Sequence, residues 1–267
     1  MAVRTFVFDL DGVVYRGAQP LPGAVDTIAT LRQLGHQVYF FTNNSTQTRT
    51  SYTEKLRNMG IPVDEEHIMT SSYATALYFM EQGAQGRSVF VVGEEGISVE
   101  LSAAGMKIVE DGERADYVVV GMDRQFTYDK LKKAQQAIFH GAKFIATNRD
   151  NTFPLEDGLV VPGGGSIVSA IEAASGVTPI VIGKPEVYAM HKVLDLAGAS
   201  LSDAVIIGDR LETDVLVGKR LGALTVLALT GVTREKDLES APPELQPDIV
   251  INHLPEMLEK LIVVSII

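Results

Sequence analysis

Cysteine is absent from the 267 residues of this chain. Without thiols there can be no disulfide bond, no thiolate metal site and no cysteine nucleophile. Long apolar runs are absent too. Stretches such as residues 261–264 are far shorter than a membrane-spanning helix, which needs about 18 apolar residues. We therefore expect no membrane span and no membrane partner.

A surplus of positive charge is also absent. The chain has 23 Lys and Arg against 34 Asp and Glu, a net charge of −11, and residues 81–180 are acidic as well. Because phosphate backbones need a basic surface, we expect no nucleic-acid partner. Asp9 and Asp11 interrupt the only apolar run near the first residue. The N-terminal segment therefore does not resemble a signal peptide. A cytoplasmic location is the expectation.

Apolar sequence is present in the amount that a sizeable core needs, at 46% hydrophobic and 21% charged residues. Short β-branched runs alternate with longer helical patterns, which is typical of an α/β protein with parallel sheets and helices on both faces. The runs are almost continuously apolar, as in strands buried on both sides. The predicted strands are residues 6–8, 38–41, 89–92, 117–120, 144–146, 180–182, 205–207, 225–229 and 249–251. The predicted helices are residues 24–34, 48–59, 128–140, 166–174, 185–196 and 213–221.

Nine strands are many for one sheet, so we expect two α/β units. Glycine and polar residues near 83–86 and 178–183 offer two crossings between such units. The prediction is a core domain of residues 1–82 and 181–267, with residues 83–180 inserted as a second domain.

Polar residues follow four of the predicted strands. Ligands of open α/β sheets bind at the carboxyl ends of strands, so these residues are the candidates for chemistry. They are Asp9 and Asp11 after residues 6–8, Thr42 and Asn43 after 38–41, Lys184 after 180–182, and Asp209 and Asp214 after 205–207.

The aspartates indicate a cation site. A spacing of two on an extended chain turns the side chains of Asp9 and Asp11 to the same side, where their charges repel. Asp209 and Asp214 add further acid at the same edge, and carboxylates without Cys or His suit a hard cation, Mg²⁺ above all. Taken singly, the same residues are ordinary: turn residues that close a strand, a helix N-cap after Thr42, and a surface lysine.

The four motifs together resemble the haloacid dehalogenase superfamily. The pattern consists of Asp9-x-Asp11-Gly12, Thr42-Asn43, Lys184, and Gly208-Asp209 with Asp214. Residues 11–17, 42–45 and 183–185 further resemble subfamily IIA, the NagD-like or p-nitrophenylphosphatase group. The likeness covers essentially the whole chain apart from residues 261–267. It implies a Rossmann-like core, a mobile cap inserted between the second and third motifs, and phosphatase activity.

The resemblance also implies a role for each motif residue. Asp9 would be the nucleophile that forms an aspartyl-phosphate, and Asp11 the general acid and base. Mg²⁺ would be held by Asp9, Asp209 and the backbone carbonyl of Asp11. The phosphoryl oxygens would be held by Thr42, the Asn43 backbone N–H and Lys184, with Asp214 in a supporting role.

Two other functions stay open: a phosphotransferase or phosphomutase on the same core, and a non-catalytic module that binds a phosphorylated metabolite. The expected partner is a small phosphorylated metabolite, and a homodimer through the cap is a further assembly open to the chain. Cap loops at residues 123–124 and 148–150 are the candidates to select the leaving group.

Overall fold

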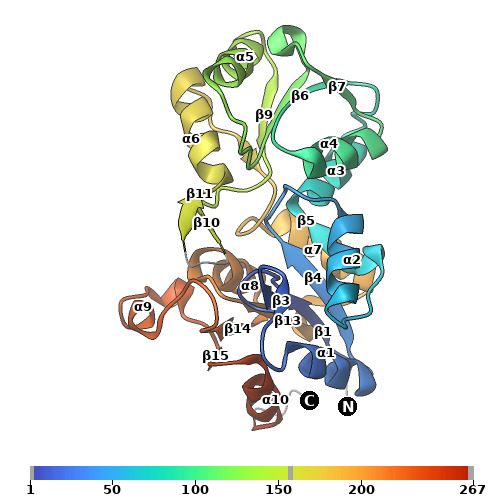
Figure 1. The fold of residues 1–267 in the computed structure, drawn as a ribbon, viewed down its shortest axis with the longest axis vertical. Coiled ribbons are helices and arrows are strands. Elements are labelled where there is room, and N and C mark those ends of the chain that lie inside the picture. The colour runs from blue at the N-terminus through green and yellow to red at the C-terminus, as the bar shows by residue number, and fades with distance from the viewer. Residues whose placement is uncertain (1–2, 156–158, 264–267) are drawn as a thin grey trace. The chain divides into compact units, whose positions relative to one another are not determined.

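A computed structural model describes residues 3–155 and 159–263. Its backbone divides into two compact units (Figure 1). The first unit comprises residues 1–42, 53–69 and 184–267, and the second comprises residues 43–52 and 70–183. Residues 43–52, 70–82 and 181–183, which we assigned to the core from the sequence, thus cluster with the second unit. The boundaries of core and cap as functional domains stay a prediction.

A six-stranded sheet organises the first unit, in the order β15-β14-β13-β1-β4-β5. The paired strands run parallel, with Phe6 of β1 opposite Val205 of β13 and Val38 of β4. β1 is buried along its whole length, as its unbroken apolar sequence predicts. The strands are β1 (Thr5–Phe8), β4 (Gln37–Thr42), β5 (Ile68–Thr70), β13 (Ala204–Gly208), β14 (Leu224–Ala228) and β15 (Ile249–Ile251).

Helices cover both faces of this sheet. The chain moves from β1 to β4 through α1 but in the opposite direction from β13 to β14 through α8. Because crossovers between parallel strands are right-handed, opposite directions place these helices on opposite faces. Accordingly α1 packs with α10, and α7 packs with α8. The helices are α1 (Ala24–Gln33), α2 (Arg49–Asn58), α7 (Val187–Ala197), α8 (Leu216–Leu221), α9 (Glu235–Glu239) and α10 (Leu254–Val263).

The second unit repeats the architecture on a smaller scale. Its five-stranded parallel sheet has the order β12-β9-β8-β6-β7, with α3 packed on α4 and α5 packed on α6. Val118, Val120 and Phe144 of the sheet pack with Ala134 of α5 and Val168 of α6 in its core. The strands are β6 (Ser88–Val92), β7 (Lys107–Val109), β8 (Tyr117–Val120), β9 (Lys143–Ala146) and β12 (Ile180–Val181). The helices are α3 (Ser71–Glu81), α4 (Glu95–Ala103), α5 (Tyr128–Phe139) and α6 (Gly164–Ser175).

Two small antiparallel pairs complete the fold, namely β2 (Tyr15–Arg16) with β3 (Gln19–Pro20) and β10 (Thr152–Pro154) with β11 (Val160–Pro162). The apolar stretch from residue 261 begins as the last turn of α10, where Leu261 is buried, and residues 264–267 lie outside the described residues. Within the described ranges, no helix combines the length and the apolarity that a bilayer crossing needs. The α/β class with parallel sheets, predicted from the sequence, is confirmed.

Candidate active site

Asp9 lies at the carboxyl end of β1, in the middle of the six-stranded sheet. Its backbone N–H donates to the carbonyl of Ile207 at 2.8 Å, which continues the ladder between β1 and β13 by one residue. The neighbouring strand β13 ends at Gly208, directly before Asp209. The parallel pairing of the two strands therefore brings Asp9 and Asp209 to the same edge.

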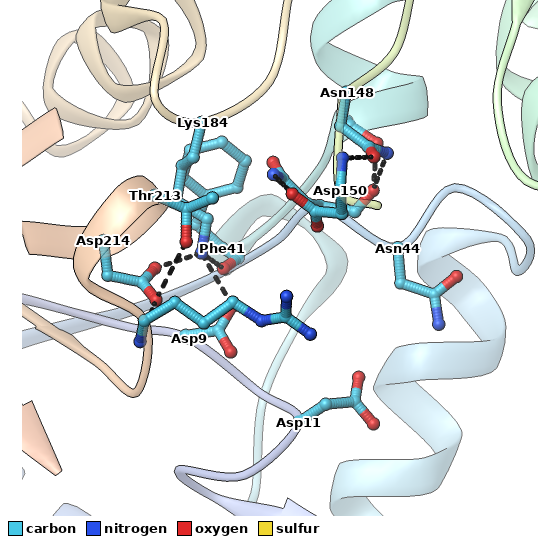
Figure 2. A network of polar contacts seen from close by, with 12 residues as sticks. Asp9, Asp11, Phe41, Asn44, Asn148, Asp150, Lys184, Thr213 and Asp214 are labelled. Carbon is cyan, nitrogen blue, oxygen red and sulfur yellow. Dashed lines mark hydrogen bonds and ion pairs between the residues drawn. The ribbon is translucent and has the colours of Figure 1, made fainter. Parts of the chain in front are cut away.

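Lys184 is the centre of a buried polar network (Figure 2). Its ammonium group donates to Asp9 Oδ1 at 2.7 Å, to Asp214 Oδ1 at 2.6 Å and to the carbonyl of Phe41 at 3.0 Å. The Lys184 side chain is 3% exposed. Burial lowers the pKa of the ammonium group, but the carboxylates of Asp214 and Asp9 outweigh it and leave that pKa above its ordinary value. Lys184 is thus a fixed positive charge beside Asp9.

Asp214 is held from its other side as well. Its Oδ2 accepts from the backbone N–H of Arg210 at 3.2 Å and from the hydroxyl of Thr213 at 3.4 Å. The close approach of Gly208 leaves no room for a side chain there, because a Cβ would lie 2.1 Å from the Asp214 carboxylate carbon. These contacts hold the carboxylate of Asp214, which holds the ammonium group of Lys184 in turn.

Asp209 is positioned by a loop that the sequence analysis did not single out. Its Oδ2 accepts from the backbone N–H of Val232 at 2.7 Å, and its carbonyl accepts from Thr233 N at 3.1 Å. A Cβ on Gly231 would lie 1.9 Å from Asp209 Oδ2. This loop follows β14, so the strand-end rule that selected the other candidates also covers it. Its contacts with Asp209 are made by backbone N–H groups, which every residue except proline has, so the residue types gave no chemical reason to notice the loop.

The three carboxylates of Asp9, Asp209 and Asp214 form one cluster. Each offers an oxygen within 4.8 Å of the others. Burial, the largest influence, raises the pKa of Asp9 and of Asp209, and the neighbouring Asp214 raises both further. The positive charges of Lys184 and Arg210 balance only part of the charge of three carboxylates. The oxygen donors and the excess negative charge therefore fit a hard divalent cation such as Mg²⁺.

Asp11 lies apart from the Lys184 network, and no polar contact joins the two in the view of Figure 2. Its carboxylate accepts from the hydroxyl of Tyr15 at 3.4 Å, and the Lys55 ammonium group lies 3.6 Å from the centre of the Tyr15 ring. Burial raises the pKa of Asp11, against the opposing influence of Lys55 and Tyr15. β1 ends at Phe8, so the alternation of an extended strand does not reach from Asp9 to Asp11.

Thr42 and Asn43 stand at the carboxyl end of β4, where the first unit gives way to the second. Thr42 is the last residue of the strand and is buried, and Asn43 is the first residue of the second unit. Within that unit, Asn43 Nδ2 donates to Asp150 Oδ1 at 3.1 Å, and the Asn43 carbonyl accepts from Asn148 Nδ2 at 2.7 Å. The sequence analysis missed this link, because 105 residues separate Asn43 from Asn148.

The other cap candidates are already paired inside the second unit. Asp123 is buried and binds Lys130 Nζ at 2.6 Å. Arg124 donates to both carboxylate oxygens of Glu94, at 2.8 Å and 2.5 Å, while remaining 65% exposed. Arg149, in the loop of residues 148–150, pairs with Glu172 at 2.5 Å and is 38% exposed, so Arg124 and Arg149 both combine a positive charge with access to solvent.

Two family models match the chain. The model described as haloacid dehalogenase-like hydrolase matches residues 6–107, which include the first two motifs. The model described as HAD-like hydrolase matches residues 181–257, which include the other two.

Known proteins are similar over nearly the full length. An acid sugar phosphatase of Staphylococcus aureus is 40% identical over 242 residues, which cover 90% of this chain and 92% of the relative. The solved p-nitrophenyl phosphatase of Archaeoglobus fulgidus is 38% identical with a TM-score of 0.90, over 97% of this chain and 99% of its own. The glycerol phosphate phosphatase of Mycobacterium tuberculosis, solved in complex with magnesium, is 32% identical with a TM-score of 0.87. The match covers 96% of this chain and 76% of the M. tuberculosis chain.

Proposed function

This chain belongs to the haloacid dehalogenase-like hydrolases and is a phosphatase, and from that premise we propose that it hydrolyses small phosphate monoesters with Mg²⁺ and an aspartyl-phosphate intermediate on Asp9. The observation that carries the proposal is the buried contact of the Asp9 carboxylate with Lys184 at 2.7 Å, beside Asp209 and Asp214. A carboxylate that is held at a strand end beside a fixed positive charge is placed to meet a phosphoryl dianion.

The first half-reaction transfers the phosphoryl group to Asp9. A carboxylate oxygen of Asp9 forms a bond to phosphorus while the bond from phosphorus to the leaving oxygen breaks. The leaving oxygen takes a proton from Asp11, and the alcohol departs. General acid help of this kind contributes typically about 10²–10⁴-fold.

The second half-reaction hydrolyses the aspartyl-phosphate and regenerates the free enzyme. Asp11, now ionised, accepts a proton from water as the water oxygen bonds to phosphorus and the bond to Asp9 breaks. Inorganic phosphate leaves, and both aspartates are restored. Dividing one difficult displacement into two easier ones is the gain of covalent catalysis.

The transferring phosphoryl oxygens are held by Lys184, by the hydroxyl of Thr42 and by the Asn43 backbone N–H. Lys184 supplies charge, since its ammonium group is fixed by Asp214 and Phe41 and needs no reorientation during the reaction. Asp214 acts through Lys184.

Asp9, Asp209 and the backbone carbonyl of Asp11 are the proposed ligands of Mg²⁺, with Asp214 completing the acidic surroundings. The cation supplies electrostatic stabilisation of the phosphoryl oxygens when it is bound. The carboxylate cluster and the magnesium complex of the M. tuberculosis relative support this assignment.

The substrate class follows from the names of the relatives and from the cap. Their names point to sugar phosphates, glycerol phosphate and p-nitrophenyl phosphate. The core handles only the phosphoryl group, which all monoesters share, so discrimination rests on contacts of the cap with the leaving group. We extend the proposal to a cytoplasmic location. We also propose a homodimer that forms through residues 83–180, and sedimentation equilibrium would test for the dimer.

The decisive experiment is hydrolysis of p-nitrophenyl phosphate with and without Mg²⁺, by the wild type and by Asp9→Asn. We expect activity only with the metal and less than a few per cent of it in the variant. Asp26→Asn, the same change on an exposed aspartate of α1, is the matched control and should leave the rate unchanged.

The same assay separates the alternatives. A phosphatase incorporates one oxygen from isotopically labelled water into the phosphate that it releases. A phosphotransferase or phosphomutase would instead deliver the phosphoryl group to another acceptor, and a binding module would turn over nothing. Either of these two results would contradict the proposal.

A further inference from the structure

Asn43 is anchored by three side chains of the second unit. Its carbonyl accepts from Asn148 Nδ2 at 2.7 Å and from Ser71 Oγ at 2.5 Å, and its own amide donates to Asp150 Oδ1 at 3.1 Å. Ser71 begins α3, whereas Asn148 and Asp150 lie in the loop that follows β9. The residue directly after Thr42 thus takes its position from the carboxyl end of a cap strand.

The orientation of the Asn148 amide is fixed. Its Oδ1 accepts from the backbone N–H of Asp150 at 3.0 Å, and its Nδ2 donates to the carbonyl of Asn43 and to the hydroxyl of Thr147. Figure 2 shows the short distance between Asn148 and Asp150 that this turn creates. An asparagine amide has two N–H donors, and both are used here. Asn148 is also only 4% exposed.

Within residues 148–150, which we predicted to select the leaving group, this saturation argues against that role for Asn148. A residue that selects a leaving group needs a donor or acceptor that faces the ligand. The two N–H groups of Asn148 are committed to Asn43 and Thr147, and its side chain is closed to solvent. Its hydrogen bonds act on the backbone of Asn43 instead.

The backbone effect follows from peptide geometry. A peptide group is planar and trans, so its carbonyl and the next N–H point in opposite directions. Two donors on the Asn43 carbonyl therefore set the direction of the Asn44 N–H. The contact of the Asn43 side-chain amide with Asp150 holds the side chain, so that the Asn43 Cα is restrained from two directions and the Asn43 N–H is restrained with it. The loop continues in a fixed form, since Asn44 Oδ1 accepts from Thr46 N at 3.0 Å.

We propose that Asn148 and Asp150 are positioning residues, which hold the backbone of residues 43–44 in the orientation that binds a phosphoryl group and which do not select the leaving group. The inference rests on the proposed function in one respect, the assignment of the Asn43 N–H to the phosphoryl oxygens. It adds that the affinity for phosphate depends on two residues of the cap.

The test compares Asn148→Ala with Asn151→Ala, the same substitution three residues later on an exposed side chain. For Asn148→Ala we expect kcat/KM to fall about tenfold, the effect of losing one well-formed hydrogen bond. The loss should be the same factor for p-nitrophenyl phosphate and for glycerol phosphate. Competitive inhibition by inorganic phosphate should weaken by a similar factor, and Asn151→Ala should match the wild type in every measurement.

Two results would overturn the inference. One is a loss that differs several-fold between the two substrates, which would mark Asn148 as a selector of the leaving group. The other is unchanged inhibition by phosphate together with reduced turnover.

A second pair of variants tests the positioning role independently, in case Asn148→Ala does not fold. Asp150→Asn keeps an oxygen that can accept from Asn43 Nδ2, whereas Asp150→Ala removes it. We expect the asparagine variant to retain most of the phosphate affinity and the alanine variant to lose it. Equal affinities in the two variants would contradict the role of Asp150.

Failure of the proposed function is recognised separately. It would be seen in the wild type, as missing hydrolysis in the presence of Mg²⁺. Calorimetric titration with inorganic phosphate measures the affinity of each variant without turnover. It therefore tests the positioning role even then, and equal affinities of the wild type and Asn148→Ala would refute it.

Discussion

Replacing Lys184 by methionine removes the ammonium group that contacts both Asp9 and Asp214. Methionine keeps most of the length and volume of the lysine side chain, so the packing beside Phe41 changes little. The contacts at 2.7 Å and 2.6 Å disappear, and the carboxylates of Asp9, Asp209 and Asp214 face one another without that charge.

The cost can be estimated from the burial of the pair. Lys184 and Asp214 are each 3% exposed, so solvent screens their attraction little. Removing one partner of such a buried pair destabilises a protein by about 3–5 kcal/mol. At about 2–4 °C for each kcal/mol in a chain of this size, the melting temperature should fall by roughly 6–20 °C. Part of the loss should return with Mg²⁺, since a cation at the carboxylates restores positive charge.

The assay is thermal unfolding of the wild type and Lys184→Met at neutral pH, with and without Mg²⁺, together with hydrolysis of p-nitrophenyl phosphate. Lys192→Met is the control, because Lys192 pairs with Asp195 at the surface, where an ion pair contributes about 0–1 kcal/mol. We expect a large Mg²⁺-dependent gain in the melting temperature of Lys184→Met and almost no hydrolysis. A variant that melts like the wild type in metal-free buffer, or that keeps more than a few per cent of the rate, would refute the reasoning.

Three further changes test separate parts of the molecule. Asp11→Asn should reduce turnover of an alkyl phosphate more than that of p-nitrophenyl phosphate, whose leaving group needs little protonation, and equal losses would argue against a general acid. Asp209→Asn should need a higher Mg²⁺ concentration for half-maximal activity, and an unchanged Mg²⁺ dependence would show that it is no ligand. Asp248→Ala should destabilise the fold by about 2 kcal/mol at pH 7, because the backbone N–H and the hydroxyl of Thr225 lose the partly exposed carboxylate that accepts from them. Burial raises the pKa of Asp248, but the Lys219 ammonium group and Thr225 outweigh it and leave that pKa below its ordinary value. The part of the difference between variant and wild type that comes from the charge should therefore be present at neutral pH and be lost as the pH falls through the folded-state pKa.

The strands of the two sheets could be predicted where their apolar runs are continuous. Each of the nine predicted strands is present, from β1 through β15. Helix α3 could not be predicted, because half of its buried face is made of small polar side chains. Ser71, Ser72 and Thr75 are buried there beside Ala74, Ala76 and Phe79. Such a face has no apolar period to detect. The three-residue strands β5, β7, β10 and β11 each contain a polar residue or a proline, whereas the predicted β15 of the same length is apolar throughout.

The candidate site could be predicted as a set of strand ends but not as a set of contacts. The parallel pairing of β1 with β13 brings Asp9 and Asp209 to one edge, and the alternation of strands and helices predicts that the strands run parallel. Lys184 was predicted to follow a strand of the same sheet, but β12 before it belongs to the five-stranded sheet, so strand order does not account for its contact with Asp9. The pairing of Asp214 with Lys184 depends on side-chain positions, and a spacing along the chain does not contain them. The same holds for Asn43 with Asn148.

The two ends of the parallel strands use aspartate in different ways. Asp116 and Asp248 each directly precede a strand, and each accepts from the backbone N–H and the hydroxyl of one residue on the neighbouring strand, Ser88 and Thr225 respectively. The contact recurs in both units because the amino end of a parallel strand leaves an N–H that the ladder does not satisfy. A carboxylate there is neutralised by backbone donors and by a nearby cation, and it has little capacity left for a ligand.

At the carboxyl ends the strands present carbonyls instead, so Asp9 and Asp209 have few donors of their own and keep oxygens for a cation. An aspartate that follows an apolar run is therefore a candidate for chemistry, whereas one that precedes it is a candidate for stability.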